Sequence, residues 1–339
     1  MPSGLANKRA SVSERAGTAT GQGIVRLDIS TRAAAPASCV AKVTSLREVA
    51  AHRLVDAALP RLTPKFFQAV SLSDENPARE RYLLLMEDCS AKAPVTTLTA
   101  LFSGPHGRRG AQKHLKAAIQ QLAAVHRRFE TCTAELERRG IGPALTGRVP
   151  DAQEVGSIIE RGLHLAGSNS RDESLGARCA VVSHQMSDFF GRMQNKERHT
   201  LVHGDFHFDN VLVREPDGPI VVDWGAAALA NPCWDLVFCG FGELAIYLYA
   251  TRTHAHRQKD FLEDHRAAVA VRMLGLLRAA LVLQQHRPAA VRSAVPIIIR
   301  NFARAALRPY RGGTGFGMAR GLRENRWLQT PSVPIPKFA

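Results

Sequence analysis

Residues 201–213 read LVHGDFHFDNVLV and residues 220–225 read IVVDWG, and these two stretches decide the fold. Residues 211–213 and 220–222 are short apolar strands on either side of the turn at residues 216–218, so they predict a β-hairpin. Asn210 stands directly before the first strand and Asp223 directly after the second. The hairpin is therefore expected to bring Asn210 and Asp223 side by side.

The polar residues around this hairpin have the composition of a phosphoryl-transfer site. Asp205 and Asn210 show the D-x-x-x-x-N spacing, and Asp223 follows the second strand. Phosphoryl transfer needs an aspartate that meets the acceptor hydroxyl and separate oxygen ligands for Mg²⁺. A tight turn at residues 203–205 or a capping Asp223 could each occur alone, but the two together around a hairpin indicate such a site. We expect Asp205 to orient the hydroxyl, and Asn210 and Asp223 to hold magnesium.

The motif HGDFHFDN followed by DWG resembles the aminoglycoside phosphotransferase and choline kinase group, which is related to the protein kinases. The resemblance implies an α+β, bilobal, protein-kinase-like fold with a small β-rich N-lobe and a larger, mainly helical C-lobe. It implies ATP as the donor, with GTP not excluded, and Mg²⁺ as the metal. It also implies that Asp205 is the catalytic residue, that Asn210 and Asp223 are the metal ligands, and that Asp235, in the stretch NPCWDL, anchors the catalytic loop.

Two histidines of the motif, His203 and His207, have two interpretations. Either could act as an acid or a base, because histidine titrates near neutral pH, but a loop imidazole more often makes hydrogen bonds that hold the neighbouring backbone. We favour this supporting role for both. Asp209 either adds negative charge near the metal or faces solvent.

The first 90 residues predict a small sheet with one helix. Residues 23–30 and 38–43 predict an antiparallel hairpin, residues 46–59 a helix, and residues 66–72 and 82–86 two further strands. Lys42, in the second strand, is placed to reach the α- and β-phosphates of a nucleotide. Glu48 is its natural partner on the following helix, although it comes only six residues later, which is closer than the usual kinase arrangement.

Two weaker features of this region concern the nucleotide. Gly17, Gly21 and Gly23 could form a loop over the phosphates, though glycine-rich segments are common. The stretch LLLMED at residues 83–88 resembles the end of the last N-lobe strand and the hinge, where backbone groups of Glu87, Asp88 and Cys89 are expected to bind adenine. Residues 47–52, 62–64 and 82–88 are also similar to the ecdysteroid-kinase-like branch of the same group.

The chain divides by composition into four parts. Residues 1–16 are polar and are expected to form a flexible, irregular N-terminus; residues 17–90 form the nucleotide-binding N-lobe; and residues 91–307 form the catalytic and acceptor-binding C-lobe. Helical patterns run over residues 111–136, 174–193, 261–285 and 290–307. Residues 308–339 are a tail rich in Gly, Pro and Arg.

Composition restricts the partners. The formal net charge is +15, but the basic residues are dispersed and no nucleic-acid-binding motif accompanies them, so we expect no nucleic-acid partner. No apolar run predicts a signal peptide or a membrane span. The six cysteines show no CxxC pair and are interpreted as reduced thiols. We expect a cytoplasmic monomer or homodimer without membrane contact.

The acceptor is expected to be a small hydroxylated molecule. Many members of the group act on antibiotics and related natural products, which implies a role in resistance or self-protection. A polycationic aminoglycoside is less favoured, because the predicted acceptor region has few carboxylates, mainly Glu243, Asp260, Glu263 and Asp264. Choline, an amino alcohol or a sugar remains an alternative. So does a non-catalytic, nucleotide-binding pseudokinase, although every expected catalytic position is occupied.

Overall fold

The computed structural model describes most of the chain, in two compact units. The described residues are 9–15, 24–31, 34–72, 81–91, 93–103, 107–145, 149–166, 173–239, 241–252, 255–286 and 288–305. The first unit contains residues 1–142 and 203–228, and the second contains residues 143–202 and 229–338. The first unit thus extends beyond the expected N-lobe of residues 17–90, because it also includes the segment after residue 90 and the HGD and DWG motifs.

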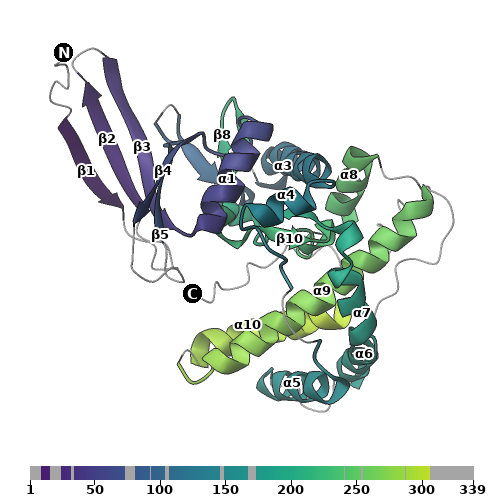
Figure 1. Ribbon diagram of the computed structural model, residues 1–339. Helices are drawn as coiled ribbons and strands as arrows, with labels where there is room; N and C mark the ends of the chain where they lie inside the picture. The colour runs from purple at the N-terminus through teal and green to yellow at the C-terminus, as the bar shows by residue number, and fades with distance from the viewer. Residues whose placement is uncertain are drawn as a thin grey trace. The chain divides into compact units, whose positions relative to one another are not determined.

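The first unit is built on a five-stranded antiparallel sheet (Figure 1). Its strands stand in the order β1-β2-β3-β5-β4 and comprise β1 (Arg9–Arg15), β2 (Ile24–Thr31), β3 (Ala34–Thr44), β4 (Phe66–Leu72) and β5 (Arg81–Glu87). The predicted hairpin is confirmed as β2 and β3. Lys42 lies on the central strand, opposite Ile24 of β2 and Leu84 of β5.

One prediction for the N-terminus was wrong. Residues 1–16 were expected to be irregular, but Arg9–Arg15 form β1, which pairs with β2 from Arg9 opposite Ser30 to Arg15 opposite Ile24. The sequence RASVSER has too few apolar residues to show a strand period. Pairing at a sheet edge needs only backbone N–H and C=O groups, which the sequence pattern does not reveal. Gly17, Gly21, Gly23 and the tail at residues 308–339 lie outside the described residues.

Helix α1 (Leu46–Ala58) follows β3 directly and packs against β4 and β5. Ser45 caps it, because the Ser45 Oγ accepts a hydrogen bond from the Glu48 N–H at 3.4 Å. Val49, Ala51 and Val55 are buried on its inner side. The predicted helix at residues 46–59 is confirmed.

The rest of the first unit carries the predicted central hairpin. Strands β8 (Val211–Arg214) and β9 (Gly218–Val221) pair antiparallel, and β6 (Val95–Thr97) adds to β8. Helices α2 (Leu98–Ser103), α3 (Gly107–Phe129) and α4 (Thr133–Arg138) complete the unit, and α3 packs on β9. The helix predicted over residues 111–136 is divided, because α3 ends at Phe129 and α4 begins after Cys132. Thr131, Cys132 and Thr133 are weak helix formers, which explains the break.

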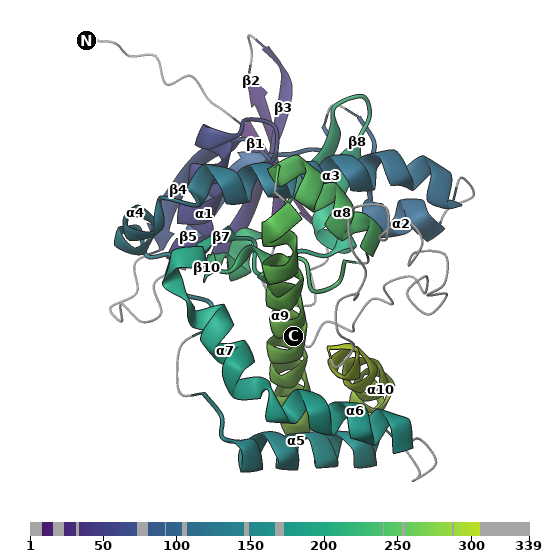
Figure 2. The ribbon, with the colours of Figure 1, turned by 90° about the vertical axis from the view of Figure 1, so that its right-hand side faces the viewer.

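The second unit is mainly helical (Figure 2). Its elements are α5 (Ala152–Leu165), α6 (Glu173–His184), α7 (Met186–Gln194), α8 (Phe241–Thr251), α9 (Ala255–Leu283) and α10 (Pro288–Arg304), with β7 (Thr200–Val202) paired to β10 (Ala228–Ala230). The long helix α9 contacts α5, α7 and α10. The helix predicted over residues 174–193 is divided at Gln185, which closes a short turn by donating its N–H to the Val182 carbonyl. Within the described residues, none of the helices combines the length and apolarity that crossing a membrane requires.

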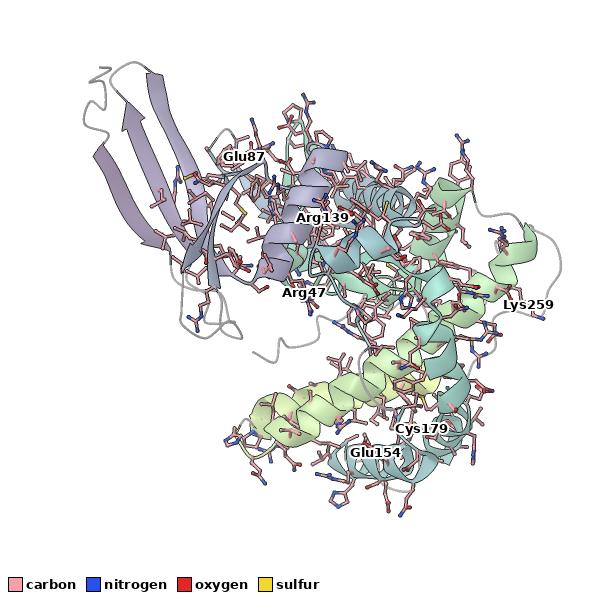
Figure 3. The ribbon with its side chains drawn as sticks, in the orientation of Figure 1. Arg47, Glu87, Arg139, Glu154, Cys179 and Lys259 are labelled. Atoms are coloured by element: carbon pink, nitrogen blue, oxygen red, sulfur yellow. The ribbon has the colours of Figure 1, made fainter. Side chains whose placement is uncertain are left out.

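Helix α5 reaches its neighbours through Gly162. A Cβ atom built on Gly162 would lie 2.8 Å from Leu277 Cδ2 of α9 and 2.9 Å from Ile299 Cδ1 of α10. Both distances are too short for carbon atoms, so the missing side chain sets how closely α5 approaches the other two helices. Figure 3 labels Glu154 on this helix and Cys179 on α6, which packs beside it.

Comparing the variants Gly162→Ala and Gly156→Ala distinguishes the effect of this close packing on stability from the effect of helix propensity. Gly156 lies on the same helix with nothing within 4 Å of the position that a Cβ would occupy, so its replacement by alanine should stabilise the protein by about 0.5–1 kcal/mol. Gly162→Ala gains the same helix propensity, but its methyl group collides with Leu277 and Ile299. Its free energy of unfolding should therefore be about 1–3 kcal/mol lower than that of Gly156→Ala. Urea denaturation followed by circular dichroism measures both. Equal stabilities would show that the contact is loose.

Candidate active site

Lys42 lies at the centre of the candidate site, between two carboxylates. Its Nζ is 2.8 Å from Glu48 Oε1 and 2.9 Å from Asp223 Oδ1. Lys42 and Glu48 are buried, and the Asp223 side chain is 39% exposed. Burial alone would lower the pKa of Lys42, but attraction to Glu48 and Asp223 outweighs it and raises the pKa above its usual value. Lys42 is therefore a cation at neutral pH.

The short spacing between Lys42 and Glu48 follows from the connection between their elements. Strand β3 ends at Thr44 and α1 begins at Leu46, so only Ser45 separates them. Glu48 thus stands in the first helical turn and can reach back to the strand. The Thr44 hydroxyl donates to Glu48 Oε2, while Glu48 Oε1 faces Lys42. The ion pair suggested by the sequence is present.

Asp223 reaches Lys42 because of its backbone conformation. It has φ 65° and ψ 63°, in the left-handed region, between β9 and the 3₁₀ turn Trp224–Ala226. Few residues other than glycine adopt this region, although aspartate tolerates it better than most. Gly225 follows, and a Cβ there would lie 3.3 Å from Glu48 Oε2. The glycine of DWG therefore leaves room for the Glu48 carboxylate.

His203 joins the HGD segment to the strand before Asp223. Its Nε2 lies 2.8 Å from the Val222 carbonyl, and its Nδ1 accepts from the Asp205 N–H at 3.3 Å. The ring is fully buried, 4.8 Å from the Trp224 ring centre. Since Nδ1 is an acceptor, the proton sits on Nε2, which donates to Val222. These contacts fit the supporting role predicted for His203.

Gly204 lets the two motifs approach each other. It has φ 83°, and a Cβ built on it would lie only 1.9 Å from the Ala226 carbonyl oxygen. Both the backbone conformation and the close approach require glycine. The HGD glycine is thus the point where the HGD segment touches the DWG turn.

The Asn210 side chain is buried, and its amide nitrogen is held by the Asp205 backbone. Its side-chain Nδ2 donates to the Asp205 backbone carbonyl at 2.9 Å, and its backbone carbonyl accepts from the Val222 N–H at 2.9 Å. Because the amide nitrogen is engaged, the amide oxygen Oδ1 is the atom that can meet a cation.

The donor set suits magnesium bound together with phosphates. Asn210 and Asp223 flank the β8–β9 hairpin and offer hard oxygen ligands. Among the described residues no three His, Cys, Asp or Glu side chains form a group that could hold a metal by itself. Mg²⁺ commonly uses one or two protein oxygens and completes its shell with phosphate and water, so this pair fits it.

His207 stands between the two acidic residues of the loop. Its Nδ1 accepts from the Asp209 N–H at 3.2 Å, and its Nε2 lies 3.4 Å from Asp205 Oδ2. The Asp209 carboxylate is farther away, with its Oδ2 3.8 Å from Nδ1. His207 thereby caps the 3₁₀ turn Phe208–Asn210, which contains the residue expected to bind metal.

The hinge residues are held by two arginines that the sequence analysis missed. Glu87, labelled in Figure 3, lies 3.0 Å from Arg214 of β8, and Asp88 lies 3.0 Å from Arg26 of β2. The paired residues are 127 positions apart in the first case, so no local sequence signal could show the contact. The two carboxylates connect the hinge to both sheets of the unit.

Other hydrogen bonds already engage some of the backbone groups that were predicted to bind adenine. The Glu87 N–H donates to the Lys65 carbonyl at 2.9 Å, and the Asp88 carbonyl accepts from the Ala91 N–H at 3.0 Å. Both of these backbone groups are already engaged within the protein. Cys89 is buried, and burial raises the pKa of its thiol to about 11. Adenine binding by the other backbone groups of Glu87, Asp88 and Cys89 stays a prediction.

The second unit changes the interpretation of the acceptor carboxylates. Asp264 is buried and contacts Arg198 at 2.6 Å, Arg192 at 3.1 Å and the Asn231 amide at 3.0 Å. Glu263 pairs with Arg266 at 2.6 Å. The expectation that Asp264 and Glu263 face an acceptor was wrong for Asp264, because a buried carboxylate with two arginine partners is already neutralised. Asp235 is also buried in this unit, and its anchoring role stays a prediction.

The family assignment follows from the sequence profile. The profile described as the phosphotransferase enzyme family (APH) matches residues 15–247, well over half of the chain. The chain therefore belongs to this family, and the predicted resemblance is confirmed. Among curated proteins, no sequence was found to match it.

Solved structures agree on the fold. A protein from Ralstonia eutropha, provisionally described as an aminoglycoside phosphotransferase, is 16% identical with a TM-score of 0.52, and the match covers 88% of this chain and 93% of that one. An AMP-bound spectinomycin phosphotransferase is 14% identical with a TM-score of 0.52, covering 84% and 91%. At such identities the likeness concerns the fold alone. The predicted kinase-like fold, with a β-rich N-terminal region and a mainly helical C-terminal region, is confirmed.

Gly204→Ala and Gly218→Ala test the contact between the two motifs. Gly218 also has a positive φ, 93°, but open space around it, so its replacement should cost only the conformational penalty of about 1–2 kcal/mol. Gly204→Ala adds a collision with backbone, and its free energy of unfolding should fall by about a further 1–3 kcal/mol. Thermal unfolding of both variants measures the difference. If both lose the same stability, the close approach at Ala226 is not rigid.

Proposed function

We propose that the protein is an ATP- and Mg²⁺-dependent phosphotransferase that transfers the γ-phosphate to a hydroxyl group of a small molecule. The observation that carries this proposal is the ion-pair cluster of Lys42 with Glu48 and Asp223. It unites β3, α1 and the DWG turn in the same unit as Asp205 and Asn210. Membership of the phosphotransferase enzyme family supports it independently.

The donor half of the site has groups for the phosphates, the metal and the adenine of the nucleotide. Lys42 binds the α- and β-phosphates, exchanging its contact with Asp223 for phosphate oxygens, while Glu48 keeps it in place. Asn210 and Asp223 would hold Mg²⁺, which would supply positive charge that offsets the charge of the phosphates. Backbone groups of the predicted hinge, Glu87 to Cys89, meet the adenine. The AMP complex of the spectinomycin phosphotransferase supports a nucleotide in this family. GTP in place of ATP is the alternative donor, and repeating the product assay with Mg-GTP distinguishes the two.

Asp205 serves the acceptor. Its carboxylate accepts the hydroxyl proton while the hydroxyl oxygen forms a bond to the γ-phosphorus. The bond from that phosphorus to the β-γ bridging oxygen breaks, ADP leaves, and the proton remains on Asp205 until it passes to solvent. The Asp205 backbone is held on both sides, at its N–H by His203 and at its carbonyl by Asn210. This support keeps the carboxylate at one place on the loop.

The acceptor that we favour is a hydroxylated antibiotic or related natural product without many positive charges. A pocket for a polycation needs several free carboxylates. Of the four candidates in the second unit, Asp264 is neutralised by two arginines and Glu263 is paired with Arg266. The net charge of +15 also disfavours a polycationic acceptor. A resistance or self-protection role would follow from such an acceptor.

The proposal predicts a phosphorylated product and its loss in Asp205→Asn. The purified protein, incubated with Mg-ATP and a panel of macrolides, aminocyclitols, aminoglycosides, choline, amino alcohols and sugars, should convert at least one compound to a phosphate adduct detected by mass spectrometry. Asp205→Asn should reduce kcat by about 10²–10⁴-fold, because the proton acceptor is lost, with little change in ATP affinity.

Two results would contradict this assignment. Near-normal turnover by a folded Asp205→Asn would remove Asp205 from its role. Mg-dependent ATP binding without a product from any compound would favour the pseudokinase alternative. Phosphorylation of choline alone would leave the phosphotransferase assignment in place and identify the protein as a metabolite kinase. The matched control is Asp217→Asn, which changes an exposed carboxylate on the turn of the same hairpin, paired with Arg214, and should retain turnover.

A further inference from the structure

His207 holds a nitrogen that the fold buries without completing its hydrogen bonding. The Nε2 atom is inaccessible to solvent and has no hydrogen-bond partner of good geometry within the described part of the chain. The nearest charged atom is Asp205 Oδ2, at 3.4 Å, which is within ion-pair distance but long for a hydrogen bond. A buried polar atom left in this state is unfavourable, so its position calls for a partner that completes it.

The other ring nitrogen determines what Nε2 can do. Nδ1 accepts the Asp209 N–H at 3.2 Å and caps the turn Phe208–Asn210. An imidazole nitrogen that accepts a hydrogen bond carries no proton, so in the neutral ring the proton is on Nε2. His207 is therefore a donor on the side that faces the Asp205 carboxylate.

We propose that His207 is a positioning residue for Asp205, an inference that rests on the proposed phosphotransfer. Its Nε2–H donates to Asp205 Oδ2 and fixes the plane of the carboxylate, so that Oδ1 is the oxygen that meets the acceptor hydroxyl. Catalytic hydrogen bonds are often long in ligand-free enzymes and tighten when the substrate binds, which accounts for the 3.4 Å separation. The role predicted for His207 from sequence, support of the backbone, belongs to Nδ1 alone.

The two roles use different nitrogens, so two substitutions can separate them. The side-chain amide of Asn reaches the position of Nδ1, where its oxygen can accept the Asp209 N–H and preserve the cap. The side-chain amide of Gln reaches the position of Nε2, where its NH₂ can donate to Asp205. His207→Asn thus keeps the structural contact, and His207→Gln keeps the positioning contact.

Steady-state kinetics with the acceptor found for the wild type test the proposal. His207→Asn should lower kcat by about 10- to 100-fold with KM for ATP within about twofold, while His207→Gln recovers most of that loss. In the Asp205→Asn background, His207→Asn should cause no further loss, because the group that it positions is already changed. The opposite order, with Asn active and Gln impaired, would reduce His207 to a cap and overturn the proposal.

A second measurement does not depend on turnover. In protein with ¹⁵N-labelled histidine, the His207 ring should show the Nε2-protonated tautomer, and Asp205→Ala should shift its Nε2 resonance strongly. Asp209→Ala, which keeps the backbone N–H at Nδ1, should shift Nε2 much less. If the chemical shift of His207 Nε2 does not change in Asp205→Ala, the proposal is contradicted even in a protein that transfers phosphate. If the expected shift is seen but no acceptor is phosphorylated, the contact stands and the proposed function fails.

Discussion

The structure of the first unit depends on one buried charge, the Lys42 ammonium, and on the two carboxylates that compensate it. A lysine inside a sheet is tolerated only when it is paired, and losing one partner of such a pair is costly. Glu48 supplies the first carboxylate from the first turn of α1, one residue after β3 ends, and Asp223 supplies the second from a left-handed conformation. The glycine of DWG gives space to Glu48. One ion-pair cluster thus connects the sheet, helix α1 and the turn that follows the β8–β9 hairpin.

The same cluster explains why the site suits a metal-bound nucleotide. One lysine faces two carboxylates, so the group carries an excess of one negative charge while no nucleotide is bound. In the proposed function, phosphate oxygens would replace Asp223 at Lys42, and Asp223 would then be available, beside Asn210, to a divalent cation. The half-exposed side chain of Asp223 is consistent with this exchange, whereas the fully buried Glu48 is suited to a permanent partner.

The sequence predicted those features that are encoded within a few residues of one another. The hairpin of β8 and β9, the strand of Lys42 and the capped start of α1 all have local patterns, and so does the motif that carries Asp205, Asn210 and Asp223. The pairing of β1 was missed because an edge strand binds through its backbone. Arg26 and Arg214 were missed, and Asp264 was misread, because their partners are distant in sequence and a charged residue has no periodicity that reveals its contacts.

The magnesium dependence of ATP binding tests whether the Lys42 cluster binds a nucleotide together with its metal. Isothermal titration calorimetry with a non-hydrolysable ATP analogue, in Mg²⁺ and in EDTA, compares the wild type with Asp223→Asn. We expect Mg²⁺ to tighten binding to the wild type at least about tenfold, a difference of about 1.4 kcal/mol, and Asp223→Asn to abolish this gain. The same magnesium-dependent gain in both proteins, or no binding to either, would contradict this expectation.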